Sequence, residues 1–225
     1  MRSTILHMQL RRALALTLLA LYLACTGAAP AVAEPLPAHP ELIRGALDNG
    51  LAYIIKKHGN PAGRLSLWLQ VASGSLNETD GTRGLAHYLE HMAFNGSANF
   101  SPGSLVPFFQ SLGMTFGRDQ NAFTGFEQTV YQLALPDTKP ETLDKGLLFL
   151  SDVAMRLSLT PVEIDNERQI ILEEKRSRAG PAQRVQEYIY ERLAPGSTFG
   201  RRLPIGAEET IKSAMPKDFK EYYSR

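Results

Sequence analysis

Hydrophobic and polar positions along this chain follow two kinds of spacing. Residues 51–56 and 65–72 alternate in part between apolar and polar side chains, which is typical of strands that bury one face. Residues 129–135 have the same strand composition. Residues 85–93 and 139–157 instead carry apolar side chains at helical intervals. The pattern therefore predicts a domain in which strands and helices are interspersed.

The clearest helix start lies near the middle of the chain. Thr160 is a good N-cap, Pro161 suits the first turn, and Glu163 completes a capping box. These signals predict a helix that ends near residue 179, before a Gly-Pro pair. Further helices are predicted over residues 102–112, opening at Pro102, and over 182–193. Together the elements predict a layered α+β or α/β domain.

The N-terminal segment has the composition of a secretory signal peptide. Three arginines (Arg2, Arg11 and Arg12) precede an apolar run over residues 13–24, and small residues at 31–33 provide a cleavage site. The apolar run is short for a bilayer span. We therefore expect removal of residues 1–33 on export and no membrane span afterwards; an N-terminal membrane anchor is the alternative.

The rest of the chain divides simply. Residues 34–44 are rich in proline and alanine and are predicted to be a linker, and residues 45–225 are expected to form the domain. The single cysteine, Cys25, lies in the signal segment, where lipid attachment is an alternative to plain cleavage. The mature chain then has no cysteine, so any metal must be held by histidine and carboxylate side chains.

Charge excludes one class of partner. The chain has 24 basic and 23 acidic side chains and a formal net charge of +1. Nucleic-acid binding usually requires a basic excess or patch, because phosphates must be neutralised. No nucleic-acid partner is expected.

Candidate chemistry centres on the segment His87-Tyr88-Leu89-Glu90-His91. On a helix, positions four apart share one face, so His87 and His91 can bind one metal ion while Glu90 lies at the edge of that face. A catalytic zinc ion uses three protein ligands and leaves a fourth position for water, whose proton a nearby carboxylate can accept. Two incidental histidines are the alternative, although the chain has only five histidines in all.

A third ligand has to come from elsewhere in the chain. The other histidines lie in the signal segment, the linker and a turn, whereas the helix predicted from Thr160 carries several carboxylates. Glu167 and Glu174 are two helical turns apart and share a face, and Glu173 is rotated away from them. The alternative is that these charged residues form an ordinary solvated helix face with salt bridges.

Three segments resemble the pitrilysin/insulinase family of zinc peptidases, which includes the mitochondrial processing peptidase and bacterial periplasmic members. They are GLAHYLEHMAFNG at residues 84–96, NAFT at 121–124 followed by TVY, and ERQIILEE at 167–174. The similarity extends from about residue 51 to the C-terminus. It implies an α+β fold, a layered sheet with helices packed on one face, and export to the bacterial periplasm.

The resemblance also implies a role for each matching residue. His87, His91 and Glu174 would bind Zn²⁺, with Glu173 as the rival for the third position, and Glu90 would be the general base. Glu167 would be a supporting acidic residue at the catalytic site. The implied activity is that of a zinc-dependent metalloendopeptidase that hydrolyses extended peptides. The peptide would pair with a strand edge formed by Asn121, Ala122, Phe123 and Thr124; an ordinary loop entering a core strand is the alternative there.

Family members contain at least two homologous domains that enclose the substrate. This chain is therefore expected to be the N-terminal catalytic domain, shortened at its C-terminus, and to work with a second homologous domain or subunit. Two alternatives follow: a non-catalytic partner subunit, and a shortened, inactive product that only binds zinc. The presence of His87, Glu90 and His91 favours the enzyme.

Overall fold

The computed structural model describes residues 37, 39–115 and 117–225. The predicted signal peptide at 1–33, with Cys25, lies outside the described residues. The contacts divide the chain into two units, with the division after Lys57. In the first unit, strands β1 (Leu42–Ala46) and β2 (Ala52–Lys56) form an antiparallel hairpin. β1 was not predicted, and it begins inside the segment expected to be a linker.

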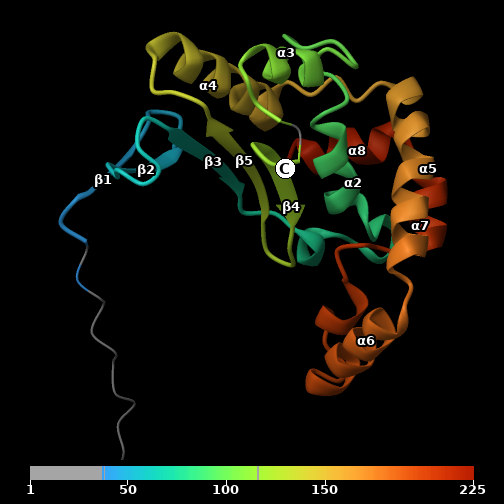
Figure 1. Cartoon of the computed structure of the whole chain (residues 1–225). Helices are drawn as coiled ribbons and strands as arrows, with labels where there is room; N and C mark the ends of the chain where they lie inside the picture. The colour runs from blue at the N-terminus through green and yellow to red at the C-terminus, as the bar shows by residue number, and fades with distance from the viewer. Residues whose placement is uncertain (1–36, 38, 116) are drawn as a thin grey trace, which may run out of the picture. The chain divides into compact units, whose positions relative to one another are not determined.

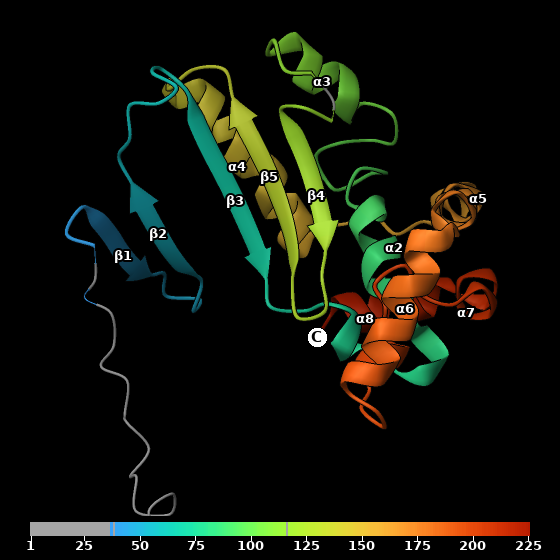
Figure 2. The same ribbon diagram turned by 60° about the horizontal axis from the view of Figure 1, so that its bottom comes forward.

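The second unit contains a three-stranded antiparallel sheet in the order β3-β5-β4 (Figure 2). Its strands are β3 (Leu65–Val71), β5 (Thr129–Leu135) and β4 (Gln120–Thr124). Leu65 lies opposite Leu135, and Ala122 lies opposite Tyr131. Within the described residues, β4 pairs with β5 alone, so its other edge is unpaired.

One face of this sheet is covered by a helix. Helix α4 (Pro140–Met155) packs on β3 and β5, and its Phe149 and Val153 join Leu133 and Leu135 in the core. On the opposite face of β3, Trp68 is 65% exposed. The predicted fold class, a sheet with helices packed on one face, is confirmed.

A second core holds the helix that carries the histidine motif. Helix α2 (Leu85–Met92) contacts β4, α5 (Pro161–Arg178) and α8 (Pro216–Tyr223) (Figure 1). Tyr88 is fully buried, and its ring lies edge-on to Phe219. Because α2 is packed on several sides, it has little freedom to shift relative to β4 and α5.

The start of α2 is fixed by contacts that are distant in sequence. The carboxylate of Glu78 accepts a hydrogen bond from the backbone N–H of Ala86 (2.9 Å), one of the N–H groups that a helix leaves without a partner in its first turn. Gly84 has φ 96°, and a side chain there would meet the backbone of Gly206. Only glycine fits this close approach.

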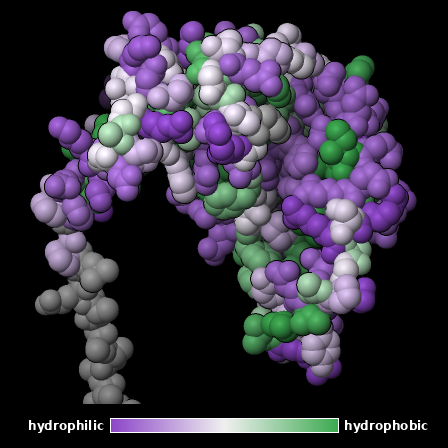
Figure 3. Space-filling view, in the orientation of Figure 1, coloured by the Kyte–Doolittle hydropathy of each residue, from purple (hydrophilic) through white to green (hydrophobic). Residues whose placement is uncertain are grey.

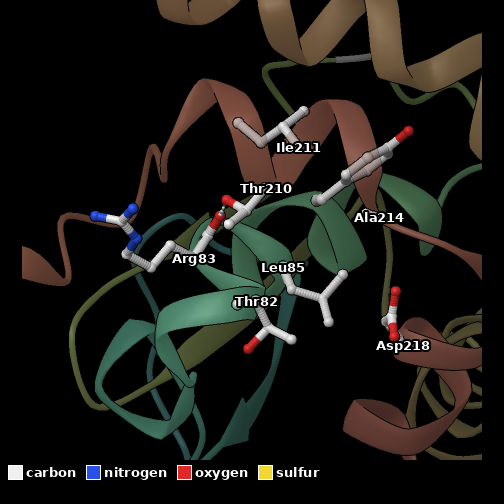
Figure 4. Close-up of a pocket in the computed structure, with 10 residues that line it drawn as sticks. Thr82, Arg83, Leu85, Thr210, Ile211, Ala214 and Asp218 are labelled. Atoms are coloured by element: carbon white, nitrogen blue, oxygen red, sulfur yellow. Dashed lines mark hydrogen bonds between the residues drawn. The ribbon is translucent and has the colours of Figure 1, made fainter.

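Helix α7 (Glu208–Ser213) completes this corner of the molecule. In Figure 4, Thr210 of α7 points to Arg83 just ahead of α2, and its hydroxyl donates to the Arg83 carbonyl oxygen. The cavity beside them has a volume of about 10 Å³, room for at most a single water. This corner is therefore a packing contact rather than a ligand site.

Two more helices complete the described fold: α3 (Leu105–Ser111) and α6 (Pro181–Leu193). α3 begins three residues later than predicted, because Gly103 adopts a left-handed conformation with φ 77° and interrupts the expected first turn. α6 buries none of its residues, and hydrophobic surface gathers on the lobe that it forms (Figure 3). Among the described helices, none has the length and apolar character needed to cross a membrane.

The short 3-10 helices are η1 (Ser75–Asn77), η2 (Asp80–Thr82) and η3 (Phe199–Arg201).

Candidate metal centre

Helix α2 presents His87 and His91 toward α5 and Glu90 toward β4. His87 and Glu90 are buried, and His91 is half-buried. The rings of His87 and His91 lie with their centroids 4.8 Å apart at an interplanar angle of 79°. This is the shared helix face that the spacing predicted.

Glu174 of α5 brings the third donor atom. Its Oε2 lies 3.4 Å from Nε2 of His87 and 3.3 Å from Nε2 of His91. The three donor atoms lie within 4.8 Å of one another. Oε2 is buried, and no hydrogen bond of ordinary geometry reaches it. Two imidazole nitrogens and one carboxylate oxygen are the ligand set of a catalytic zinc ion, so these residues fit the metal.

The neighbouring carboxylate faces another way. The Glu173 side chain is 64% exposed and forms an ion pair with Arg176 on the surface of α5. Of the two glutamates that the sequence left open, Glu174 is therefore the one that the fold brings to the histidines.

Glu167 lies behind His91 rather than among the three donors. Its Oε1 is 2.8 Å from Nδ1 of His91, and its Oε2 accepts a hydrogen bond from the side-chain amide of Asn95 (2.5 Å). A carboxylate at Nδ1 fixes the tautomer and orientation of a metal-binding imidazole, with Nε2 left toward the ion. The arrangement gives Glu167 a supporting contact at the site.

The charge states of the three donors differ because their surroundings differ. Burial lowers the pKa of His87 to about 4, so its ring is neutral at pH 7. Burial also acts to lower the pKa of His91, but the contacts with Glu167 and Glu174 outweigh it and raise that pKa to about 9. The contact with His91 lowers the pKa of Glu174 to about 2. The centre therefore offers an ionised carboxylate to a cation.

Glu90 lies between the histidines in sequence but has a different partner. Its Oε2 accepts a hydrogen bond from the hydroxyl of Thr124 on β4 (2.6 Å). Burial raises the pKa of Glu90, and the Thr124 hydrogen bond opposes that shift in part. Glu90 is thus a buried carboxylate beside the metal donors, held by the sheet edge rather than by them.

A cleft of about 370 Å³ opens beside these residues. Glu90 and His91 line one side, and Phe94, Ala122 and Ile170 give it apolar walls. Asn121 and Phe123 are exposed, whereas Ala122 and Thr124 are half-buried. The predicted segment is therefore a strand at the edge of the sheet, next to the metal donors, and not an ordinary loop.

Sequence reasoning missed several contacts of this centre. Asn95, Arg178 and the hydroxyl of Thr124 each bind one of its carboxylates. The spacing of Arg178, four residues after Glu174 on the same helix, is a signal that could have identified an ion pair. The other two contacts join separate elements, and no local spacing indicates them.

Comparison with known proteins agrees with this geometry. The sequence model of the insulinase family (peptidase family M16) matches residues 53–203. The probable zinc protease PqqL of Escherichia coli (strain K12) is 36% identical over 194 residues, which cover 86% of this chain and 21% of that protein. The zinc protease PQQL-like of Arabidopsis thaliana is 34% identical over 181 residues, covering 80% of this chain and 19% of that protein.

A solved structure gives the same result for the fold. The crystal structure of the first half of the periplasmic protease PqqL from Escherichia coli matches with a TM-score of 0.81 and 36% identity. The match covers 84% of this chain and 41% of that one. The chain spans about a fifth of the length of the curated relatives named above. The resemblance noted in the sequence is confirmed: the chain belongs to the insulinase family of peptidases, family M16.

Proposed function

We propose that this chain is the zinc-binding catalytic domain of an exported metalloendopeptidase that hydrolyses extended peptides. The observation that carries the proposal is the convergence of His87 Nε2, His91 Nε2 and Glu174 Oε2, with the buried carboxylate of Glu90 beside them. Membership of the M16 family and two zinc-protease relatives support it.

The three donors would hold Zn²⁺, which supplies a water of lowered pKa and polarises a peptide carbonyl group. Glu167 would keep the His91 ring turned so that Nε2 faces the ion. Glu90 would act as the general base. It would take up the proton of the water and later deliver it to the leaving amine, while the Thr124 hydroxyl donates to its Oε2.

The substrate would be an extended peptide pairing with the free edge of β4. The backbone N–H of Ala122 donates to the side-chain oxygen of its neighbour Asn121 (2.9 Å) and not to β5, so it faces the unpaired side. A peptide strand placed there can accept from it by β-augmentation. The apolar walls of the adjacent cleft, Phe94 and Ile170, would receive a hydrophobic side chain of the peptide.

The whole protein would need more than this domain. The match to one half of a periplasmic protease supports a second homologous domain or subunit that closes over the peptide. The same relative, with the signal segment in the sequence, supports export to the periplasm.

Replacing the proposed base separates catalysis from metal binding. Glu90→Gln keeps the size of the side chain and the hydrogen bond to Thr124 but cannot take up a proton. It should retain zinc and lower the rate of hydrolysis of an unfolded peptide by a factor of about 10² to 10⁴. The measurements are zinc content and kcat on the purified protein, with Glu173→Gln as the matched control. Hydrolysis at the wild-type rate in the zinc-loaded Glu90→Gln variant would exclude Glu90 as the base.

A further inference from the structure

Arg178 contacts one of the three candidate metal donors, Glu174, through the carboxylate oxygen that does not face the histidines. Its guanidinium group forms an ion pair with Oε1 of Glu174, four residues earlier on α5. The other oxygen of the same carboxylate, Oε2, faces Nε2 of both histidines. The two oxygens of Glu174 are therefore divided between an arginine and the metal donors.

This division limits what the carboxylate can do. A free glutamate on a helix samples several rotamers, and its carboxylate can bind a cation through one oxygen or both. With Oε1 held by Arg178, Oε2 alone is directed to the histidine nitrogens. The Arg178 contact orients the Glu174 carboxylate, just as the Glu167 contact orients the His91 ring.

We infer that Arg178 is a positioning residue for zinc binding: it holds Glu174 so that a single oxygen, Oε2, meets the metal. The inference rests on the proposed function, because it takes Glu174 as a zinc ligand. Arg178 itself touches neither the histidines nor Glu90 through any hydrogen bond or ion pair of the described residues.

The direction in which zinc affinity changes when Arg178 is removed distinguishes a positioning role from an effect of charge alone. By charge alone, a guanidinium group near a dication weakens binding, so removing it would tighten zinc. Loss of a partner that orients a ligand weakens metal affinity instead, typically by a factor of about 10 to 100. A weaker zinc complex in Arg178→Ala is therefore opposite to the result expected from electrostatic repulsion.

The same helix turn offers a matched control. Arg176 also forms an ion pair with a glutamate on α5, but its partner is the exposed Glu173. Arg176→Ala removes the same charge and the same type of i,i+3 or i,i+4 contact, with no link to the donors. The zinc affinity of Arg176→Ala should lie within a factor of about two of the wild-type value, because an exposed ion pair contributes little free energy.

The experiment is chelator competition for Zn²⁺ at fixed pH and ionic strength, on the wild-type protein and on three variants. Arg178→Ala should weaken zinc binding about tenfold. Arg178→Lys should recover most of that loss, because the contact is made through one nitrogen and an ammonium group can supply it. Arg176→Ala should match the wild type.

Two further readouts keep the outcome decisive. The visible absorption of bound Co²⁺ reports its coordination number, and it should change in Arg178→Ala but not in Arg176→Ala. The unfolding midpoint of the metal-free proteins should be alike for the two alanine variants. A midpoint lowered in Arg178→Ala alone, with an unchanged Co²⁺ spectrum, would assign Arg178 to helix stability and overturn the inference.

Failure of this inference and failure of the proposed function give different results. If the wild type binds no zinc, or Glu174→Gln binds it as well as the wild type does, the proposed ligand set is wrong. If Glu174→Gln loses zinc while Arg178→Ala binds it as tightly as Arg176→Ala or more tightly, only the role of Arg178 is wrong.

Discussion

Single carboxylates in this molecule behave differently because each has its own surroundings. Glu174 and Glu167 face the histidines, and those contacts hold their pKa values below the ordinary range despite burial. Glu90 and Glu78 are buried without such partners, and burial raises the pKa of both. One residue type thus supplies a candidate ligand, a supporting contact, a candidate base and a helix cap.

The raised pKa of Glu78 makes the free energy of unfolding depend on pH. Burial raises its pKa to about 7, from an ordinary value of 4.5, although the backbone N–H of Ala86 opposes the shift. Between these two pH values the folded state holds a proton that the unfolded state has lost. The free energy of unfolding therefore falls as pH rises from 4.5 to 7, by about 3 kcal/mol from this group.

Glu78→Gln should remove that slope, because the amide oxygen still accepts from Ala86 and does not titrate. Urea unfolding of both proteins at pH 5 and pH 7 measures the effect as a difference. The variant should gain stability relative to the wild type as pH rises. An equal difference at both pH values would mean that Glu78 is not protonated in the folded state.

At the scale of elements, α5 joins the candidate metal donors to the core. Ile164 and Ile171 on this helix are fully buried against α2 and its neighbours, and the same helix supplies Glu167 and Glu174. The hydroxyl of Thr160 accepts a hydrogen bond from the backbone N–H of Glu163 at 3.4 Å, which caps the first turn. The geometry of the site therefore depends on the packing of α5 as well as on its carboxylates.

Two adjacent isoleucines test this dependence. Ile171 is fully buried, whereas Ile170 is 54% exposed at the wall of the cleft. Ile171→Ala should lower the free energy of unfolding by about 2 to 5 kcal/mol through the cavity that it leaves, and Ile170→Ala by well under half of that. Equal losses in denaturant unfolding would contradict the packing described for α5.

The helices and strands that could be predicted from the sequence are those with clear local signals. Thr160 and Pro161 placed the start of α5, strand composition placed β5, and apolar residues at helical intervals placed α2. The spacing of His87 and His91 placed the two side chains on one face of α2. The hairpin strand β1 was missed because it begins inside residues 34–44, whose proline and alanine content predicts a linker. The start of α3 was misplaced because the conformation of Gly103 cannot be read from periodicity.

Local sequence signals could not predict contacts between segments that are distant in sequence. The resemblance singled out Glu174 as a ligand, but periodicity alone could not separate it from a solvated helix face. The hydrogen bonds from Thr124 to Glu90 and from Asn95 to Glu167 arise only when β4, α2 and α5 are packed together. Burial of Glu78 likewise depends on the fold and not on its neighbours in sequence.

At the scale of the molecule, the second unit leaves surfaces that a longer protein can use. In the described residues β4 has a free edge beside the candidate metal donors, and Trp68 on β3 is 65% exposed. The matching relatives are about four times as long as this chain. A single substitution in β4 can test whether a peptide binds along this edge.

Ala122→Pro removes the backbone N–H at the middle of β4, which faces away from β5. Proline is tolerated at edge positions whose N–H is outside the ladder, so the sheet should remain intact. We expect KM for an extended peptide to rise about tenfold, roughly the effect of one lost hydrogen bond, with zinc content unchanged. An unchanged KM would place the peptide elsewhere on the molecule.

We propose that two histidines of α2 and one glutamate of α5 bind a single zinc ion. Elemental analysis of the purified protein, together with Glu174→Gln and Glu173→Gln, tests it most directly. We expect about one zinc per chain in the wild type and in Glu173→Gln, and a large loss of zinc in Glu174→Gln. A wild-type protein without stoichiometric zinc, or equal retention in the two variants, would contradict it.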